Sequence, residues 1–163
     1  MQACLRGIAV RAYQHAPMQT LTHAVVTVDK GVAHDARGKP SLRQVTILSE
    51  ASWLLVCHQL KVLQPTLPPY AFSWLNRRAN LLISHRIFNT TDIGSTLRIG
   101  SCVLEITQPC NPCVKMDQHI KGLQALLTPA LTAGVCCKVI SGGYIKLGDQ
   151  VTLTPQPYQA LLL

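Results

Sequence analysis

The chain has 163 residues, of which 48% are hydrophobic and 13% are charged. This length and composition exclude a disordered chain and predict a single domain over residues 1–163. Because 15 Lys and Arg residues stand against 7 Asp and Glu residues, the formal net charge is +8, which indicates an anionic partner such as phosphate, nucleic acid or a phosphorylated cofactor.

The first part of the chain is predicted to form short strands and one helix. Three segments are rich in β-branched residues, which is typical of strands; they are residues 7–11, 24–29 and 43–48. Residues 30–40 form a polar loop bounded by glycines. Ser49 follows the third strand and is expected to cap a helix over residues 50–62.

That polar loop carries a His34-Asp35 pair, which allows two interpretations. The pair could provide a general base. The alternative, which we favour, is that Asp35 is a turn residue whose carboxylate binds backbone N–H groups. No G-x-S-x-G motif accompanies the pair, so a serine hydrolase site is not recognised.

A hairpin pattern occurs twice in the second half of the chain. A proline-rich linker over residues 64–70 leads into a loop and strand over residues 76–83. Residues 96–106 and residues 144–153 each contain an alternating strand, a Gly-Ser or Gly-Asp turn and a second alternating strand. This pattern predicts two antiparallel hairpins.

A helix and a strand are expected between the two hairpins. Residues 114–127 are predicted to be helical, with Pro129 ending the helix, and residues 135–140 are predicted to be a strand. Many short strands with about two peripheral helices indicate a mainly β fold. A closed or nearly closed, mostly antiparallel β-barrel is expected, because it leaves few exposed edges. The sequence contains neither a G-x-G-x-x-G fingerprint nor a G-x-x-x-x-G-K-[ST] phosphate loop.

The most informative segment is a proline-rich turn that presents two of the seven cysteines. Pro109 and Pro112 lack an N–H group and fix φ, so they should end the preceding strand and rigidify the turn that carries Cys110 and Cys113. A thiol on a rigid turn is positioned for ligation or chemistry rather than for packing. Cys113 is therefore the first candidate for an active centre.

The Cys110–Cys113 spacing alone leaves zinc binding, thiol exchange or an inert thiol open. A zinc site would need two further ligands, but Cys136 and Cys137 are adjacent in a predicted strand and should point to opposite faces. Thioredoxin-like proteins, which exchange thiols and disulfides, place C-x-x-C at the start of a helix that follows a strand in a βαβ unit, and this sequence lacks that unit. Cys136 and Cys137 are expected to be small core residues.

Polar residues precede two of the predicted strands: Arg43, Gln44, Arg77, Arg78 and Asn80. Arginine offers a planar fork for phosphate or carboxylate, and Asn and Gln pair donor and acceptor with the edge of a heterocycle. Together they could hold a charged, nitrogen-rich cofactor; the alternative is that they are solvated loop residues and strand caps. The basic residues form no dense run and no nucleic-acid-binding motif, so nucleic acid is not the expected partner.

The N-terminus does not have the pattern of a secretory signal, because Arg6 and Arg11 interrupt its apolar residues. No apolar run approaches the length of a membrane span, so no membrane partner is expected. We therefore expect a cytoplasmic protein with reduced thiols, and the odd number of cysteines agrees with this.

An ordered set of segments resembles the MOSC domain family, which is named after the C-terminal region of molybdenum cofactor sulfurases. The segments are residues 43–48, 78–82, 97–100, 104–107, 112–117, 122–126, 134–139 and 142–149. The chain is similar to the small stand-alone bacterial members, over about residues 7–153. One difference is that residues 131–134 read Leu-Thr-Ala-Gly where close relatives commonly carry Trp-Arg-Gly-Gly.

The resemblance implies a MOSC-type β-barrel that binds the molybdenum cofactor, a phosphorylated pterin dithiolene; pyridoxal phosphate is not expected. It also implies that Cys113 is the metal-ligating or sulfur-carrying thiol, which suits a thiophilic metal. The predicted cofactor contacts are Arg43, Arg77 and Arg78 on the phosphate and Gln44 and Asn80 on the pterin edge.

Three functions follow as hypotheses from the resemblance. The first is a molybdenum-cofactor protein that supports oxygen-atom transfer, such as reduction of N-hydroxylated compounds, or sulfur transfer. The second is a cofactor-free carrier with a persulfide on Cys113. The third is a non-enzymatic binding domain. A redox or sulfur-donor protein is the expected protein partner.

Overall fold

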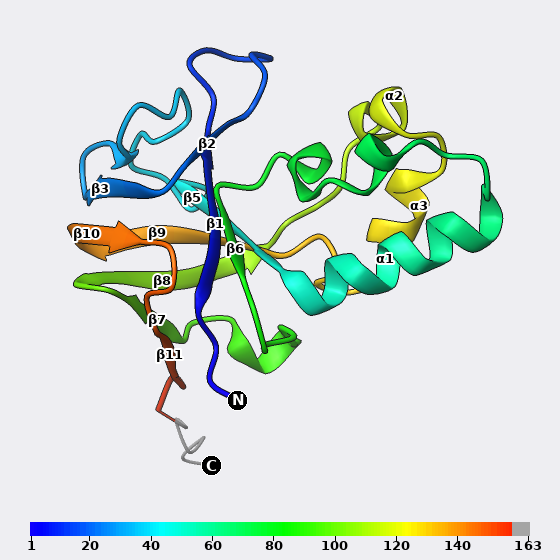
Figure 1. Cartoon of the computed structure of the whole chain (residues 1–163). Coiled ribbons are helices and arrows are strands. Elements are labelled where there is room, and N and C mark those ends of the chain that lie inside the picture. Colours follow the sequence, from blue (N-terminus) through cyan, green and yellow to red (C-terminus); the bar gives the residue numbers. More distant parts are fainter. Residues whose placement is uncertain (158–163) are drawn as a thin grey trace.

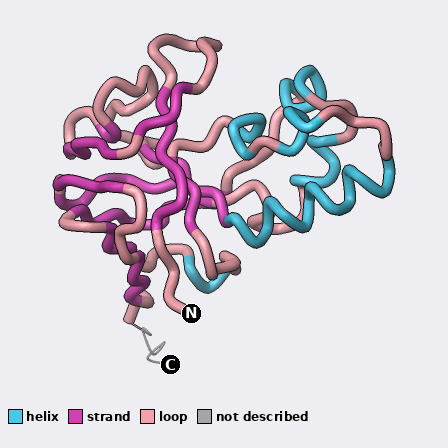
Figure 2. Tube along the Cα trace, in the orientation of Figure 1, coloured by secondary structure: helices cyan, strands magenta, loops and turns pink. Residues whose placement is uncertain are grey.

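The computed structural model of the protein describes residues 1–157. The fold is mainly β, and its strands gather at one end of the molecule while the α-helices gather at the other (Figures 1 and 2). In these residues no helix has both the length and the apolar character needed to cross a membrane.

The larger sheet has eight strands. Their spatial order is β11 (Val151–Thr154), β7 (Thr96–Ile99), β8 (Cys102–Pro109), β9 (Val135–Ser141), β5 (Val45–Ser49), β6 (Leu81–Ile83), β1 (Leu5–Val10) and β2 (Gln19–Leu21). Neighbouring strands are antiparallel except β5 and β6, which are parallel. A smaller sheet contains β10 (Gly143–Lys146), β3 (His23–Thr27) and β4 (Gly31–Val32), all antiparallel.

The predicted closure of the sheet into a barrel is not confirmed. The end strands β11 and β2 form no ladder with each other within the described residues. One isolated bridge between Cys4 and Gln150 links the chain before β1 to the chain before β11. This contact brings two parts of the sheet together without a continuous ladder.

The two predicted hairpins have different outcomes. The hairpin over residues 96–106 is confirmed, since β7 and β8 pair directly across their turn. The hairpin over residues 144–153 is wrong, because β10 pairs with β3 and β11 pairs with β7. The turn between them binds the start of β1 instead: Leu5 N–H donates to Asp149 O at 2.8 Å, and Gly148 N–H donates to Leu5 O at 2.8 Å.

Three α-helices are present in place of about two: α1 (Glu50–Leu63), α2 (Lys115–His119) and α3 (Leu123–Leu127). Short 3-10 helices cover η1 (Pro69–Phe72), η2 (Trp74–Arg77) and η3 (Thr90–Asp92). The predicted cap of α1 is confirmed, because Ser49 Oγ accepts the N–H of Ser52 at 3.1 Å. A single helix over residues 114–127 is wrong: Ile120 is extended and Gly122 has φ +84°, which breaks it into α2 and α3.

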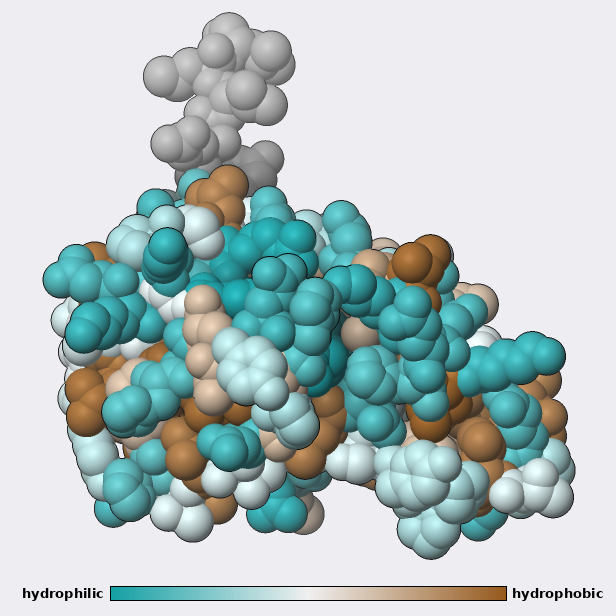
Figure 3. Space-filling model, turned by 90° about the horizontal axis from the view of Figure 1, so that it is seen from above, coloured by the Kyte–Doolittle hydropathy of each residue, from teal (hydrophilic) through white to brown (hydrophobic). Residues whose placement is uncertain are grey.

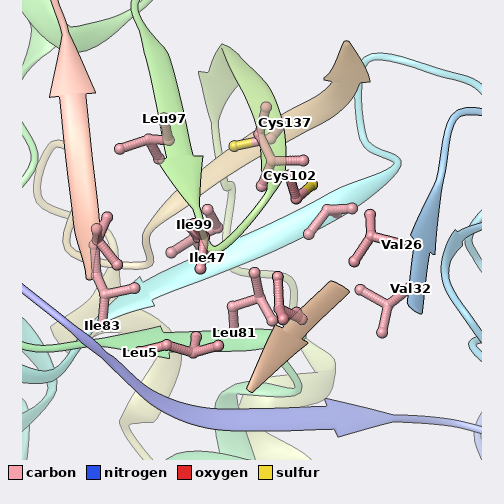
Figure 4. Packing of buried hydrophobic residues seen from close by; sticks show 14 of the residues in the cluster. Leu5, Val26, Val32, Ile47, Leu81, Ile83, Leu97, Ile99, Cys102 and Cys137 are labelled. Carbon is pink, nitrogen blue, oxygen red and sulfur yellow. The ribbon is translucent and has the colours of Figure 1, made fainter. Parts of the chain in front are cut away.

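The core consists of two clusters on the two faces of the central strands. One cluster lies among the strands and includes Ile47, Ile99 and Cys137 (Figure 4). The other joins the sheet to the helices and includes Trp53 and Cys136. The adjacent cysteines of β9 are thus both buried core residues on opposite faces, as the alternation of a strand predicts.

Candidate functional site

A large open cavity of about 1080 Å³ is lined by four parts of the chain. They are residues 11–15 after β1, residues 36–46, residues 77–80 and residues 111–119. From above, hydrophilic side chains cover much of the middle of the molecule, where the strand-rich and helical parts meet (Figure 3). The volume is at the upper end of the range for small-molecule and cofactor sites.

The cavity is strongly basic. Seven of its lining residues are Lys or Arg, and none is Asp or Glu: Arg11, Arg37, Lys39, Arg43, Arg77, Arg78 and Lys115. Two histidines, His15 and His119, also line it. A concave surface of one charge sign attracts ligands of the opposite sign, so the expected ligand is an anion.

Asp35 lies behind this surface and holds Arg11 in place. Its buried carboxylate accepts the backbone N–H groups of Arg11 at 2.9 Å and Arg37 at 3.3 Å, which confirms its predicted role in the turn. Asp35 Oδ1 also lies 3.6 Å from Arg11 Nε. Burial lowers the pKa of Arg11; Asp35 opposes this shift, and the nearby Arg78 adds to it.

Arg77 and Arg78 are fixed by backbone carbonyls. Arg77 Nε donates to Ala133 O at 2.7 Å, and Arg78 Nη2 donates to Ala16 O at 2.6 Å. Arg78 ends η2 in a left-handed conformation with φ +59°, so the chain reverses there. Burial lowers the pKa of Arg78, and Arg37 lowers it further. Each guanidinium keeps donors that these bonds do not use.

The two predicted amide residues differ in position. Asn80 lines the cavity, but its side chain already accepts from Thr46 N–H at 3.1 Å and donates to Ala9 O at 3.2 Å. Gln44 is buried and does not line the cavity. Its Nε2 donates to two carbonyl oxygens and its Oε1 accepts the N–H of Val139 at 2.9 Å. The predicted cofactor contact of Gln44 is therefore corrected to a structural role, since its amide is fully used by the backbone.

Cys113 is exposed and lines the cavity from the loop between β8 and α2. Its carbonyl oxygen accepts the N–H of Met116 at 2.9 Å, which begins the turn into α2. Asn111 and Pro112 of the same loop also line the cavity. The structure thus brings Cys113, Arg43, Arg77, Arg78 and Asn80 to one cavity.

Cys110 turns away from Cys113 into the core. Its Sγ lies 3.3 Å from Cys136 Sγ, and both side chains are buried. The hydrogen bond from Cys110 lowers the pKa of Cys136 to about 6. The positive charges of Arg43 and Arg77 also lower it, whereas burial raises it. The same contact and burial raise the pKa of Cys110 well above its ordinary value.

No group of three or more His, Cys, Asp or Glu side chains in residues 1–157 is arranged to hold a metal ion. A zinc site built on Cys110 and Cys113 therefore has no support from the geometry. A metal bound to Cys113 would therefore take most of its other ligands from a cofactor.

Sequence reasoning missed most of the basic lining. Arg11, Arg37 with Lys39, and Lys115 come from three distant parts of the chain, and none of them was assigned to the site from the sequence. The excess of positive charge in loops and at strand ends was the one sequence feature that indicated a basic site. Only the pairing of distant strands shows that these loops meet.

Comparison with known proteins places the chain among related folds. The MOSC domain family model matches residues 34–152. The YuaD protein from Bacillus subtilis has a similar structure, with a TM-score of 0.74 and 16% identity over 96% of this chain and 97% of that one. YiiM from Escherichia coli has a TM-score of 0.70 and 16% identity over 94% of this chain and 70% of that one. No curated protein sequence gives a significant match.

Proposed function

The chain belongs to the MOSC domain family, and we propose that its basic cavity binds the molybdenum cofactor with Cys113 as a thiolate ligand. The observation that carries the proposal is that an exposed thiol and seven basic side chains line one cavity that has no acidic lining residue. Cations suit the phosphate of this cofactor, and a thiolate suits its thiophilic metal.

The residues present fit such a group. Arg77 and Arg78 are held by carbonyl oxygens, so their free donors can meet a phosphate without first being ordered. Arg43 is exposed at the rim and adds charge. Asn80 contributes to the wall next to Thr46 and keeps one amide hydrogen for a ligand.

When bound, the cofactor would supply a redox metal able to exchange an oxygen or sulfur atom with a substrate. The protein would supply a thiolate from Cys113 and cations that balance the negative charge. Asp35 does not line the cavity, but its contacts would keep Arg11 and the loop of Arg37 in place. Oxygen-atom transfer, with reduction of N-hydroxylated compounds as one form, is the activity we propose, with a redox protein as electron donor.

The second candidate is a cofactor-free sulfur carrier. Cys113 is exposed in a basic cavity, and positive charge stabilises the anionic form of a persulfide as it does a thiolate. A sulfur-donor protein would then replace the redox partner. A persulfide appears as a mass increase on Cys113 that a dithiol reductant removes.

The test is molybdenum and pterin analysis of protein purified from a host that makes the cofactor. Wild type, Cys113→Ser and Cys57→Ser are compared; Cys57 is partly buried on α1 and does not line the cavity. We expect near-stoichiometric molybdenum and pterin in wild type and Cys57→Ser, and loss of molybdenum in Cys113→Ser. Absence of both from wild type would reject the cofactor proposal, and a persulfide on Cys113 would then favour the sulfur carrier.

A further inference from the structure

Cys110 and Cys136 form a buried thiol pair that the proposed function does not use. Their sulfur atoms are 3.3 Å apart, and the side chains belong to the cluster between the sheet and the helices. The backbone holds them together, because Cys110 N–H donates to Gly134 O at 2.9 Å and β8 pairs with β9 up to Pro109 and Val135.

This pair differs from the other cysteines of residues 1–157. Cys102 and Cys137 lie in the other core cluster and make no sulfur–sulfur hydrogen-bond contact there. Cys113 is exposed in the cavity loop. The Cys110 and Cys136 sulfurs need to approach by only about 1 Å to reach the length of a disulfide bond, which is near 2.05 Å.

The surroundings of the pair favour the thiolate form of Cys136. The hydrogen bond from Cys110 is the main cause that lowers the pKa of Cys136, and Arg43 and Arg77, which also line the cavity, lower it further. The thiolate is the form that attacks oxidants, and a neighbouring thiol can then resolve the product. Cys110 is placed to be that resolving thiol.

We propose that Cys110 and Cys136 form a reversible disulfide that ties the Cys113-bearing segment to β9. With hydrogen peroxide as oxidant, the Cys136 thiolate attacks one oxygen, the O–O bond breaks, and a sulfenic acid and hydroxide form. The Cys110 sulfur then attacks the sulfenic sulfur, an S–S bond forms and the S–O bond breaks. The two thiols lose two electrons, and the peroxide leaves as two water molecules.

The bond would close a loop that contains the Cys113 turn, α2 and α3. The Cys113 turn and α2 form one wall of the cavity, so oxidation would hold that wall against the sheet. A cross-link over this span restricts the unfolded chain and should raise the Tm by roughly 5–10 °C. The disulfide does not depend on any cofactor, so it and the proposed function can fail separately.

The test uses the full chain, treated with hydrogen peroxide and then alkylated under denaturing conditions. Wild type should lose two alkylatable thiols of its seven. Peptide mapping should join Cys110 to Cys136, the Tm should rise, and dithiothreitol should reverse both changes. Cys136→Ala should lose the cross-link and the Tm rise. Cys137→Ala, the equally buried neighbour on the other face, should keep them.

Retention of all seven thiols by wild type after peroxide treatment would overturn the proposal. A mapped Cys110–Cys113 bond, or a cross-link that survives in Cys136→Ala, would overturn it as well. The mapping on wild type decides the question even if a variant does not fold.

Discussion

Asp35→Asn should destabilise the fold while strengthening the binding of anions. The carboxylate lies 3.6 Å from Arg11 Nε, and the two side chains are 1% and 9% exposed. Arg11 Nε has no hydrogen-bond partner, so the charge of Asp35 is its main compensation. Asparagine keeps an oxygen that can accept the N–H of Arg11 but removes this charge.

The size of the effect follows from burial. Removing one partner of a buried ion pair typically costs about 3–5 kcal/mol. Because asparagine keeps one acceptor and the cavity admits water, we expect a loss of about 2–4 kcal/mol in the free energy of unfolding. Asp35 also acts on Arg78, so its neutralisation should raise the affinity of the cavity for inorganic phosphate.

Urea unfolding and phosphate titration by calorimetry measure the two effects. Glu50→Gln is the matched control, since Glu50 pairs with Arg6 at the surface and should contribute under about 1 kcal/mol. Equal stability losses in Asp35→Asn and Glu50→Gln would refute the reasoning that Asp35 compensates a buried cation. Weaker phosphate binding in a folded Asp35→Asn protein would refute the electrostatic part.

Three further predictions concern single residues. Arg77→Gln should weaken phosphate binding by about tenfold or more and reduce its dependence on salt, whereas Arg98→Gln, an exposed change on β7 outside the cavity, should leave both unchanged in the same titration. Gly134→Ala should lower the free energy of unfolding in urea by about 2–4 kcal/mol, because Gly134 has φ +94° and a Cβ there would lie 2.2 Å from Ile47 O; an unchanged midpoint would contradict this. The pKa of Cys136 is lowered to about 6 from an ordinary 9.0, so its ionisation stabilises the fold fully above pH 9 and progressively less as the pH falls toward 6. Unfolding measured across this window should show less loss of stability at low pH in Cys136→Ala than in wild type, and equal loss would exclude the thiolate.

Local sequence signals predicted the elements that depend on near neighbours. Ser49 caps α1 because its side chain reaches an N–H only three residues away. The hairpin of β7 and β8 closes across its own Gly100-Ser101 turn. Cys136 and Cys137 face opposite sides because strand geometry alone fixes this alternation.

Contacts between residues that are distant along the chain could not be predicted from the sequence. The turn at Gly148 and Asp149 resembles a hairpin turn, but β10 pairs with β3 in the smaller sheet and β11 pairs with β7 in the larger one. Gln44 looked like a ligand-binding amide, yet it binds three backbone groups from elements that only the fold brings together. The Cys110–Cys136 contact likewise depends on the pairing of β8 with β9.

The most direct test of the central claim is X-ray absorption at the molybdenum edge of protein loaded with the cofactor. If Cys113 is the ligand, wild type will show one more sulfur ligand on molybdenum than the free cofactor, and Cys113→Ser will lack it. Cys110→Ser should keep this ligand, since Cys110 is buried against Cys136. Sulfur coordination that is identical in wild type and Cys113→Ser would show that Cys113 does not bind the metal.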